Sequence, residues 1–179
     1  MMTDLPFSKL IDIADFADPK LLPFLHEISR GEMERFGLTE PLVVPDSKQW
    51  ECAMMLRTLS EQGILRPGAV IAGIGAGTEE TTFALAARGC IVFPTDRYLE
   101  QTPWSDVAPA AMMVRPQQYT QLKHDHRNVI PVHTDARALS LPSDFFDAVY
   151  SAGSIEHFGS LAAVRAAAEE IGRILKPGG

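Results

Sequence analysis

Four short segments of the chain are apolar, apart from Asp147 in the last of them, and each ends on a polar or glycine-rich stretch. They are residues 69–74, 90–94, 129–132 and 145–150. A continuous apolar run of this length indicates a strand that is buried on both faces, as in a parallel sheet. Helical patterns lie between the first two runs, at 78–87, and after the fourth, at 161–175. This alternation predicts an α/β fold in which helices cover both faces of a parallel sheet.

The first 65 residues follow a different pattern. Residues 1–45 contain five prolines, which interrupt helices and strands, so we expect an irregular lead-in with short helical pieces near residues 21–30. Residues 47–62 have helical spacing with apolar side chains on two faces. A helix of this kind is held between two layers. We therefore expect a helical lead-in over 1–65 and a main domain over 66–179.

The composition narrows the range of functions. The chain has 179 residues and a formal net charge of −7, and an acidic surface repels phosphate backbones, so nucleic acid is not the expected partner. Two cysteines, Cys52 and Cys90, are too few for a disulfide framework or a cysteine zinc cluster, which favours a reducing cytoplasm. No apolar run approaches the roughly 18 residues of a membrane span, and the acidic start does not resemble a signal peptide.

Polar residues stand where the expected strands end. The run 75–77 follows the first strand, Asp96 ends the second, Asp135 follows the third and Ser151 follows the fourth. The carboxyl ends of parallel strands meet at one edge of the sheet, and open α/β sheets bind their ligands there. The sequence therefore predicts one ligand site built from all four strand ends.

The glycine-rich turn alone fits a dinucleotide, a nucleotide or S-adenosylmethionine. The dinucleotide pattern Gly-x-Gly-x-x-Gly fails, because Thr78 or Glu80 stands at the place of the third glycine. Thr78 is placed to cap the helix that follows, and Glu79 and Glu80 would repel a pyrophosphate at its N-terminus. No Walker motif is present. These features favour a ligand with a ribose and no phosphate, such as S-adenosylmethionine.

The acids that end the second and third strands suit the nucleoside part of such a ligand. Asp96 is placed to accept hydrogen bonds from the ribose hydroxyls, and Asp135 from the adenine amino group. We expect Tyr98 or the stem of Arg97 to cover the adenine face.

The motifs, taken in order, resemble those of the class I (Rossmann-like) S-adenosylmethionine-dependent methyltransferases. They are the runs VIAGIGAGTEETTFALAARG, CIVFPTD, VIPVHTDARALSLPSDFFDAVYSAGSIEHF and RILKPGG. The resemblance covers 69–179, about two-thirds of the family's fold, and implies a strand order of 3-2-1-4. It implies a chain truncated after the fourth strand and the following helix, whose fourth strand is covered by a partner or a second copy. The run SIEHFG, with Gln-Trp-Glu at 49–51, resembles a bacterial subgroup linked to glycan or cell-surface biosynthesis.

The resemblance carries a set of cofactor contacts onto this chain. They are Gly75, Ala76 and Gly77 at the methionine part, Asp96 at the ribose, Asp135 and Ala136 at the adenine, and the segment that starts at Ser151 and ends at Ser154, which lines the methyl-transfer site. Arg97 is counted with the cofactor contacts through its stem at the adenine face. Two positions depart from the pattern. Gly73, counted with the cofactor loop, stands where the family has an acid for the cofactor's amino group, and Glu79 stands where it has a third glycine. Our hypothesis is that Glu79 or Glu80 replaces the missing acid.

His157 is the candidate general base, and Glu156 is placed to orient it or to bind the acceptor. The alternative for His157 is a structural side chain that packs under the site. Trp104 and Tyr119 either line an acceptor pocket or anchor their loop. The run His-Asp-His at 124–126 lacks the spacing of a metal site, so we expect no metal.

These features together predict an S-adenosylmethionine-dependent methyltransferase that acts on a hydroxyl of a small molecule or glycan. The family's Asn/Asp-Pro-Pro-Tyr/Phe signature for planar amines is absent, because the fourth strand end reads Ser-Ala-Gly-Ser. Two alternatives remain open. One is a non-catalytic, methyltransferase-like binding module, and the other is an NAD(P)-dependent oxidoreductase.

Overall fold

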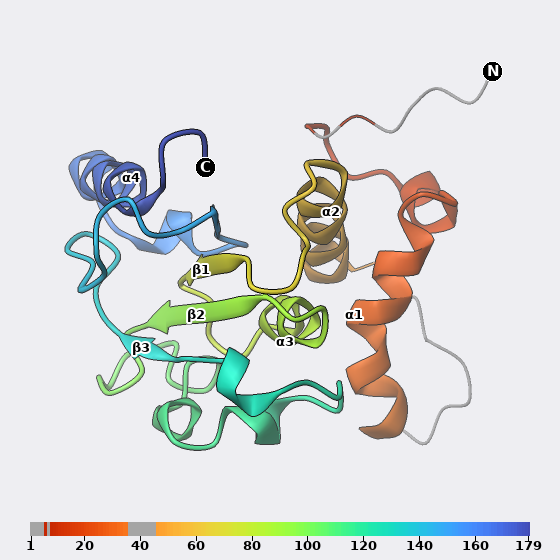
Figure 1. The fold of residues 1–179 in the computed structure, drawn as a ribbon, viewed down its shortest axis with the longest axis horizontal. Coiled ribbons are helices and arrows are strands. Elements are labelled where there is room, and N and C mark those ends of the chain that lie inside the picture. Colours follow the sequence, from red (N-terminus) through yellow and green to blue (C-terminus); the bar gives the residue numbers. More distant parts are fainter. Residues whose placement is uncertain (1–5, 7, 36–45) are drawn as a thin grey trace.

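A computed structural model describes residue 6 and residues 8–35 and 46–179 of the chain. Its sheet has four parallel strands in the order β3-β2-β1-β4 (Figure 1), which confirms the predicted order. The strands are β1 (Val70–Ile74), β2 (Ile91–Asp96), β3 (Val132–His133) and β4 (Ala148–Tyr150). The α-helices are α1 (Leu22–Arg35), α2 (Ser47–Glu61), α3 (Glu80–Ala87) and α4 (Leu161–Ile174). Short 3-10 turns lie at Ile13–Ala17, Ala110–Met113, Pro116–Tyr119, His126–Asn128 and Ile155–His157.

Two strands are shorter than the apolar runs that predicted them. β3 keeps only Val132–His133, with a separate bridge from Val129 to Val92, because Pro131 has no N–H to donate to a ladder. β4 begins at Ala148, because the carboxylate of Asp147 takes the N–H of Val70 at 2.8 Å. The outer strands are therefore brief, and β1 and β2 form the centre of the sheet.

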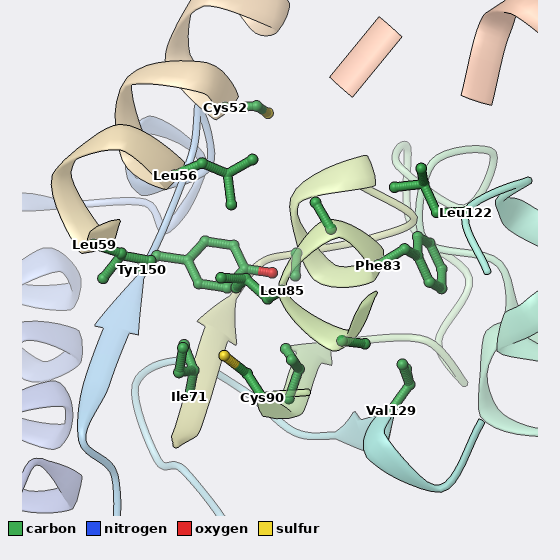
Figure 2. Packing of buried hydrophobic residues seen from close by; sticks show 14 of the residues in the cluster. Cys52, Leu56, Leu59, Ile71, Phe83, Leu85, Cys90, Leu122, Val129 and Tyr150 are labelled. Atoms are coloured by element: carbon green, nitrogen blue, oxygen red, sulfur yellow. The ribbon is translucent and has the colours of Figure 1, made fainter. Parts of the chain in front are cut away.

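Helices cover both faces of the sheet, as predicted. On one face, Ile71 and Tyr150 belong to the same buried cluster as Leu56 of α2 and Phe83 of α3 (Figure 2). On the other face, Ile74 packs in a cluster with Ile174 of α4. The free cysteines Cys52 and Cys90 are buried in the first cluster, where they pack as small apolar side chains.

The N-terminal part is more regular than the prolines indicated. α1 runs for 14 residues, and Pro23 does not interrupt it because the first helical turn tolerates proline. α1 lies beside α2 (Figure 1), and Leu21 and Leu25 pack with Ala53 and Met54. The second apolar face of α2 is thus covered by α1, as expected. The helical piece expected near residues 21–30 is present and is longer than expected, because α1 continues to Arg35. Pro41 and Pro45 lie outside the described residues.

β3 and β4 are the two edges of the described sheet. Coverage of β4 by a partner or a second copy stays a prediction. None of the described helices combines the length and the apolar character needed to cross a bilayer.

Candidate functional site

A cavity of about 800 Å³ opens at the carboxyl ends of the four strands. Segments 75–79, 95–97, 134–137, 152–154 and 157–159 contribute most of its wall, together with the loop 101–107 and the side chain of Lys48. Its lining includes nine of the predicted site residues, which are Gly75, Ala76, Gly77, Glu79, Asp96, Arg97, Asp135, Ala136 and His157. Gly73, Ser151 and Glu156 are not among the residues that line it.

The turn after β1 needs glycine at two positions. Gly75 and Gly77 have φ angles of 66° and 48°, a region that side chains disfavour. A Cβ at Gly75 would lie 2.6 Å from the Ser154 hydroxyl oxygen, and one at Gly77 would lie 2.5 Å from the carbonyl oxygen of Val107. The turn is therefore packed tightly between the loop after β4 and the loop after β2.

The helix after this turn starts differently from the prediction. Its N-cap is Glu79, which makes no side-chain cap hydrogen bond, whereas Thr78 was expected to cap it. The Thr78 hydroxyl instead lies 3.4 Å from the carbonyl oxygen of Val107, in the loop that covers the turn. The prediction failed because Thr78 is used to hold that loop.

Asp96 is fixed to the glycine turn. One of its carboxylate oxygens accepts the Gly77 N–H at 3.1 Å, and the other accepts the Arg97 N–H at 2.7 Å. Burial raises the pKa of Asp96, and these two amides oppose the rise. A carboxylate offers about four acceptor positions, so both oxygens keep capacity for ligand hydroxyls.

Asp135 is held by the side chain and the backbone of Arg137. Its Oδ1 accepts the Arg137 N–H at 2.9 Å and Nε at 2.8 Å, and the guanidinium lowers the pKa of Asp135 to about 2. Tyr98 does not cover a ligand face as expected. It is 2% exposed and donates its hydroxyl to the Gly77 carbonyl at 2.8 Å, so it supports the turn from beneath. Arg97 lines the cavity, paired with Glu100.

Glu79 is a buried carboxylate at the wall of the cavity. Its side chain is 9% exposed, and its Oε1 accepts from Lys48 Nζ at 3.1 Å. Its Oε2 is buried, and no described residue donates a hydrogen bond to it. Burial raises the pKa of Glu79 to about 7 against the attraction of Lys48, and the nearby carboxylates of Asp96 and Glu51 add to the rise.

Glu80 is turned away from this wall. It accepts a hydrogen bond from the Thr120 hydroxyl at 2.9 Å and does not line the large cavity. Of the two glutamates in the hypothesis, Glu79 alone is therefore at the cavity.

The sequence reasoning missed Lys48. Its ammonium joins three segments, because it donates to Glu79 and also to the Ala152 carbonyl at 2.6 Å, beyond β4. One signal was available. A cation in the first turn of a helix is unfavourable beside the helix dipole, so Lys48 at the second position of α2 indicates a specific partner elsewhere.

Gly73 lies under the ring of Tyr150. A Cβ at this position would lie 2.5 Å from both Cζ and Oη of Tyr150, whose hydroxyl is 2.7 Å from that of Thr82. A side chain at position 73, acidic or not, cannot share this space. The ring explains why the expected acid is missing from this strand.

The segment after β4 brings His157 to the cavity. Its ring stacks on Trp104, with centroids 4.2 Å apart and planes tilted by 34°. Glu156 is exposed, and Tyr119 packs against the buried cluster that contains Phe83 instead of lining the cavity. The Ser151 hydroxyl donates to the Ile74 carbonyl at 2.9 Å, so it ties β4 to β1.

The run 124–126 forms a connector. His124 stacks on Phe83 with centroids 5.6 Å apart, and Asp125 is paired with Arg127. Within residues 8–35 and 46–179, no three His, Cys, Asp or Glu side chains converge in the way that a metal site needs.

Comparison with known proteins shows which family and which solved structures this chain is similar to. Residues 72–179 match the family model described as a methyltransferase domain. Among solved structures, the YcgJ protein from Bacillus subtilis matches with a TM-score of 0.52 and 24% identity, over 70% of this chain and 46% of its own. The glycopeptide N-methyltransferase MtfA, in complex with sinefungin, matches with a TM-score of 0.51 and 17% identity, over 72% and 47%. The [4+2]-cyclase SpnF matches with a TM-score of 0.50 and 21% identity, over 72% and 43%.

At these identities the three structures show a shared fold. The chain spans less than half the length of each of them. The comparison with curated proteins finds no significant match. The family model, however, covers well over half of the chain, and the strand order is the 3-2-1-4 order that the sequence resemblance implied. The chain therefore belongs to the methyltransferase-domain family and has the class I, Rossmann-like fold of the S-adenosylmethionine-dependent methyltransferases.

Proposed function

We propose that the chain holds S-adenosylmethionine in the cavity at its strand ends and forms the cofactor-binding part of a methyltransferase. In this proposal residues 66–179 are the cofactor domain, and residues 1–65 are a helical lead-in whose helices α1 and α2 pack on it. Family membership supports the proposal, and so does the position of Asp96, which keeps free acceptor capacity beside the glycine turn. Asp96 binds the ribose hydroxyls, while Asp135 and Ala136 contact the adenine.

The observation that carries this proposal is the buried Oε2 of Glu79. A buried carboxylate oxygen without a donor is costly, so such an atom in a cavity wall indicates a ligand that supplies one. The ammonium group of S-adenosylmethionine is a donor of this kind. Glu79 takes the role that the family gives to an acid at the position of Gly73, because the ring of Tyr150 excludes any side chain there.

The acceptor lies beside His157 and Trp104, and we propose a hydroxyl of a small molecule or glycan. The His157 ring would take the proton of the hydroxyl, and bound S-adenosylmethionine would supply its sulfonium methyl group to the oxygen, with the former S–C bonding pair staying on sulfur. The position of His157 in the cavity wall supports its role as base. A contribution of Glu156 to acceptor binding, a bacterial source and a cytoplasmic location remain predictions.

Isothermal titration with S-adenosylmethionine and S-adenosylhomocysteine tests the cofactor assignment. We expect both to bind and NAD to give no heat, because Glu79 at the start of α3 opposes a pyrophosphate. Absence of heat from both ligands with a folded sample contradicts the proposal, and binding of NAD instead supports an oxidoreductase.

A second assay separates transfer from binding. Release of S-adenosylhomocysteine is followed with a panel of phenols, sugars and nucleosides as acceptors. This separation is needed because the same fold is found in a protein described as a cyclase. Cofactor binding without product over the whole panel supports the non-catalytic alternative.

A further inference from the structure

Lys48 reaches the cofactor cavity from outside the segment that matches the family. It lies in the first turn of α2, whereas the matching segment starts at residue 72. Its side chain lines the cavity and bridges Glu79, at the start of α3, to the Ala152 carbonyl after β4. A residue of the N-terminal helices thus forms part of the proposed site.

The Lys48–Glu79 pair leaves one donor and one acceptor unused. An ammonium group has three N–H donors, and the structure shows two of them engaged, at Glu79 and Ala152. The Lys48 side chain is 47% exposed, so its third donor has access to the cavity. The Oε2 atom of Glu79 has no donor among the described residues.

The other two cations in the cavity wall are already neutralised within their own loops. Arg97 is paired with Glu100, and Arg137 is paired with Asp135. Lys48 is the lining cation next to Glu79, which is where the ammonium group is bound under the proposed function. A carboxylate attached to the same carbon as that ammonium would come to lie beside Lys48.

We infer that the Lys48–Glu79 pair is a preformed receptor for a zwitterionic α-amino-acid group, in which Lys48 binds the carboxylate and Glu79 the ammonium. This inference rests on the proposed function and adds the residue that distinguishes the intact amino-acid end from truncated nucleosides. The Glu79 carboxylate exchanges part of its contact with Lys48 for the ligand ammonium. Lys48 then turns its free donor to the ligand carboxylate, so that the four charges alternate in sign.

The test compares ligands that differ only in the carboxylate. Binding of S-adenosylhomocysteine and of its decarboxylated analogue is measured by titration calorimetry with the full chain, for the wild type and for Lys48→Met. A charge-assisted hydrogen bond predicts that the wild type prefers the intact ligand by about 10- to 100-fold. In Lys48→Met we expect this preference to fall to about threefold or less, with the affinity for the decarboxylated analogue changed by less than about threefold.

Two further variants control for charge and for folding. Lys48→Arg keeps a cation and should retain a preference of at least about tenfold for the carboxylate. Lys123→Met removes an exposed lysine outside the cavity wall and should behave as the wild type does. Circular dichroism and thermal melting confirm that each variant is folded.

Each outcome decides the inference. A wild type that binds both ligands equally overturns it, even if Lys48→Met does not fold, and so does a Lys48→Met protein that keeps the wild-type preference. In both cases the proposed function stands, because S-adenosylhomocysteine still binds. If the folded wild type binds neither ligand, the proposed function fails and this inference fails with it.

Discussion

Replacing Glu79 by glutamine should stabilise the ligand-free protein at high pH and have little effect at low pH. The Glu79 carboxyl is buried beside Lys48 and near Asp96, and burial raises its pKa to about 7. Glutamine has nearly the same shape as the protonated acid and carries no charge. The difference in stability between the variant and the wild type therefore isolates the cost of ionising this one group in the fold.

The magnitude follows from the two pKa values of Glu79. The carboxyl titrates near 4.5 in the unfolded chain and near 7 in the folded one. Between these values the folded state holds a proton that the unfolded state has released, so the stability of the wild type falls as the pH rises through this window. Above about pH 7 the loss is complete, and about 2.5 pKa units correspond to about 3 kcal/mol. The Glu79→Gln protein has no ionisable group at this position, so it loses no stability from this site over the same pH range.

Urea unfolding of both proteins at about pH 5, 6, 7 and 8 measures this difference, since other titrating groups cancel between them. Glu169→Gln, at an exposed position on α4, is the matched control. Its free energy of unfolding should differ from that of the wild type by the same amount at every pH. If the free energies of unfolding of Glu79→Gln and the wild type also differ by a constant amount over this pH range, ionisation of Glu79 does not destabilise the fold. The unpaired Oε2 atom of Glu79 would then give no reason to expect a ligand that donates to it.

Three further predictions concern other residues of the site. Asp96→Asn should weaken S-adenosylhomocysteine binding by about 10- to 100-fold in titration calorimetry, because an amide nitrogen replaces a carboxylate acceptor; an unchanged affinity would remove Asp96 from the ribose site. Gly73→Ala should lower the free energy of unfolding by about 1–3 kcal/mol or more in urea, because its Cβ overlaps the Tyr150 ring, and a variant as stable as the wild type would contradict the packing. His157→Phe keeps a ring against Trp104, so cofactor binding should persist while turnover of a hydroxyl acceptor falls by about 10²–10⁴-fold; unchanged turnover would assign His157 a packing role.

The parts of the site that were predictable are those fixed by strand ends. A buried strand needs a continuous apolar run, and the chain turns polar where the strand leaves the core. Asp96 and the turn at Gly75 and Gly77 could therefore be placed at one edge of the sheet from the sequence, since parallel strands end there together. Asp135 followed from the same reasoning, although its strand is only two residues long.

The parts that were not predictable depend on side chains that meet across the fold. Lys48 and Glu79 are 31 positions apart and come from different helices, so nothing local in the sequence relates them. Tyr98 stands two residues after Asp96, which suggested a ligand contact, but its hydroxyl donates to the Gly77 carbonyl from the buried side. Adjacency in sequence fixes where a residue is, whereas the direction of its side chain is decided by packing.

The two departures from the family pattern are best understood as one rearrangement. The ring of Tyr150 fills the space beside Gly73 and reaches Thr82 on α3, so an acid cannot occupy the strand. The cavity wall still contains an acid, Glu79, directly before α3. The family pattern has its third glycine at this position. Burial raises the pKa of the Glu79 carboxyl, and a nearby cation favours its ionised form. Lys48 of α2 is that cation. Through Lys48, α2 therefore contributes to the charge of the cavity wall as well as to the packing of the fold.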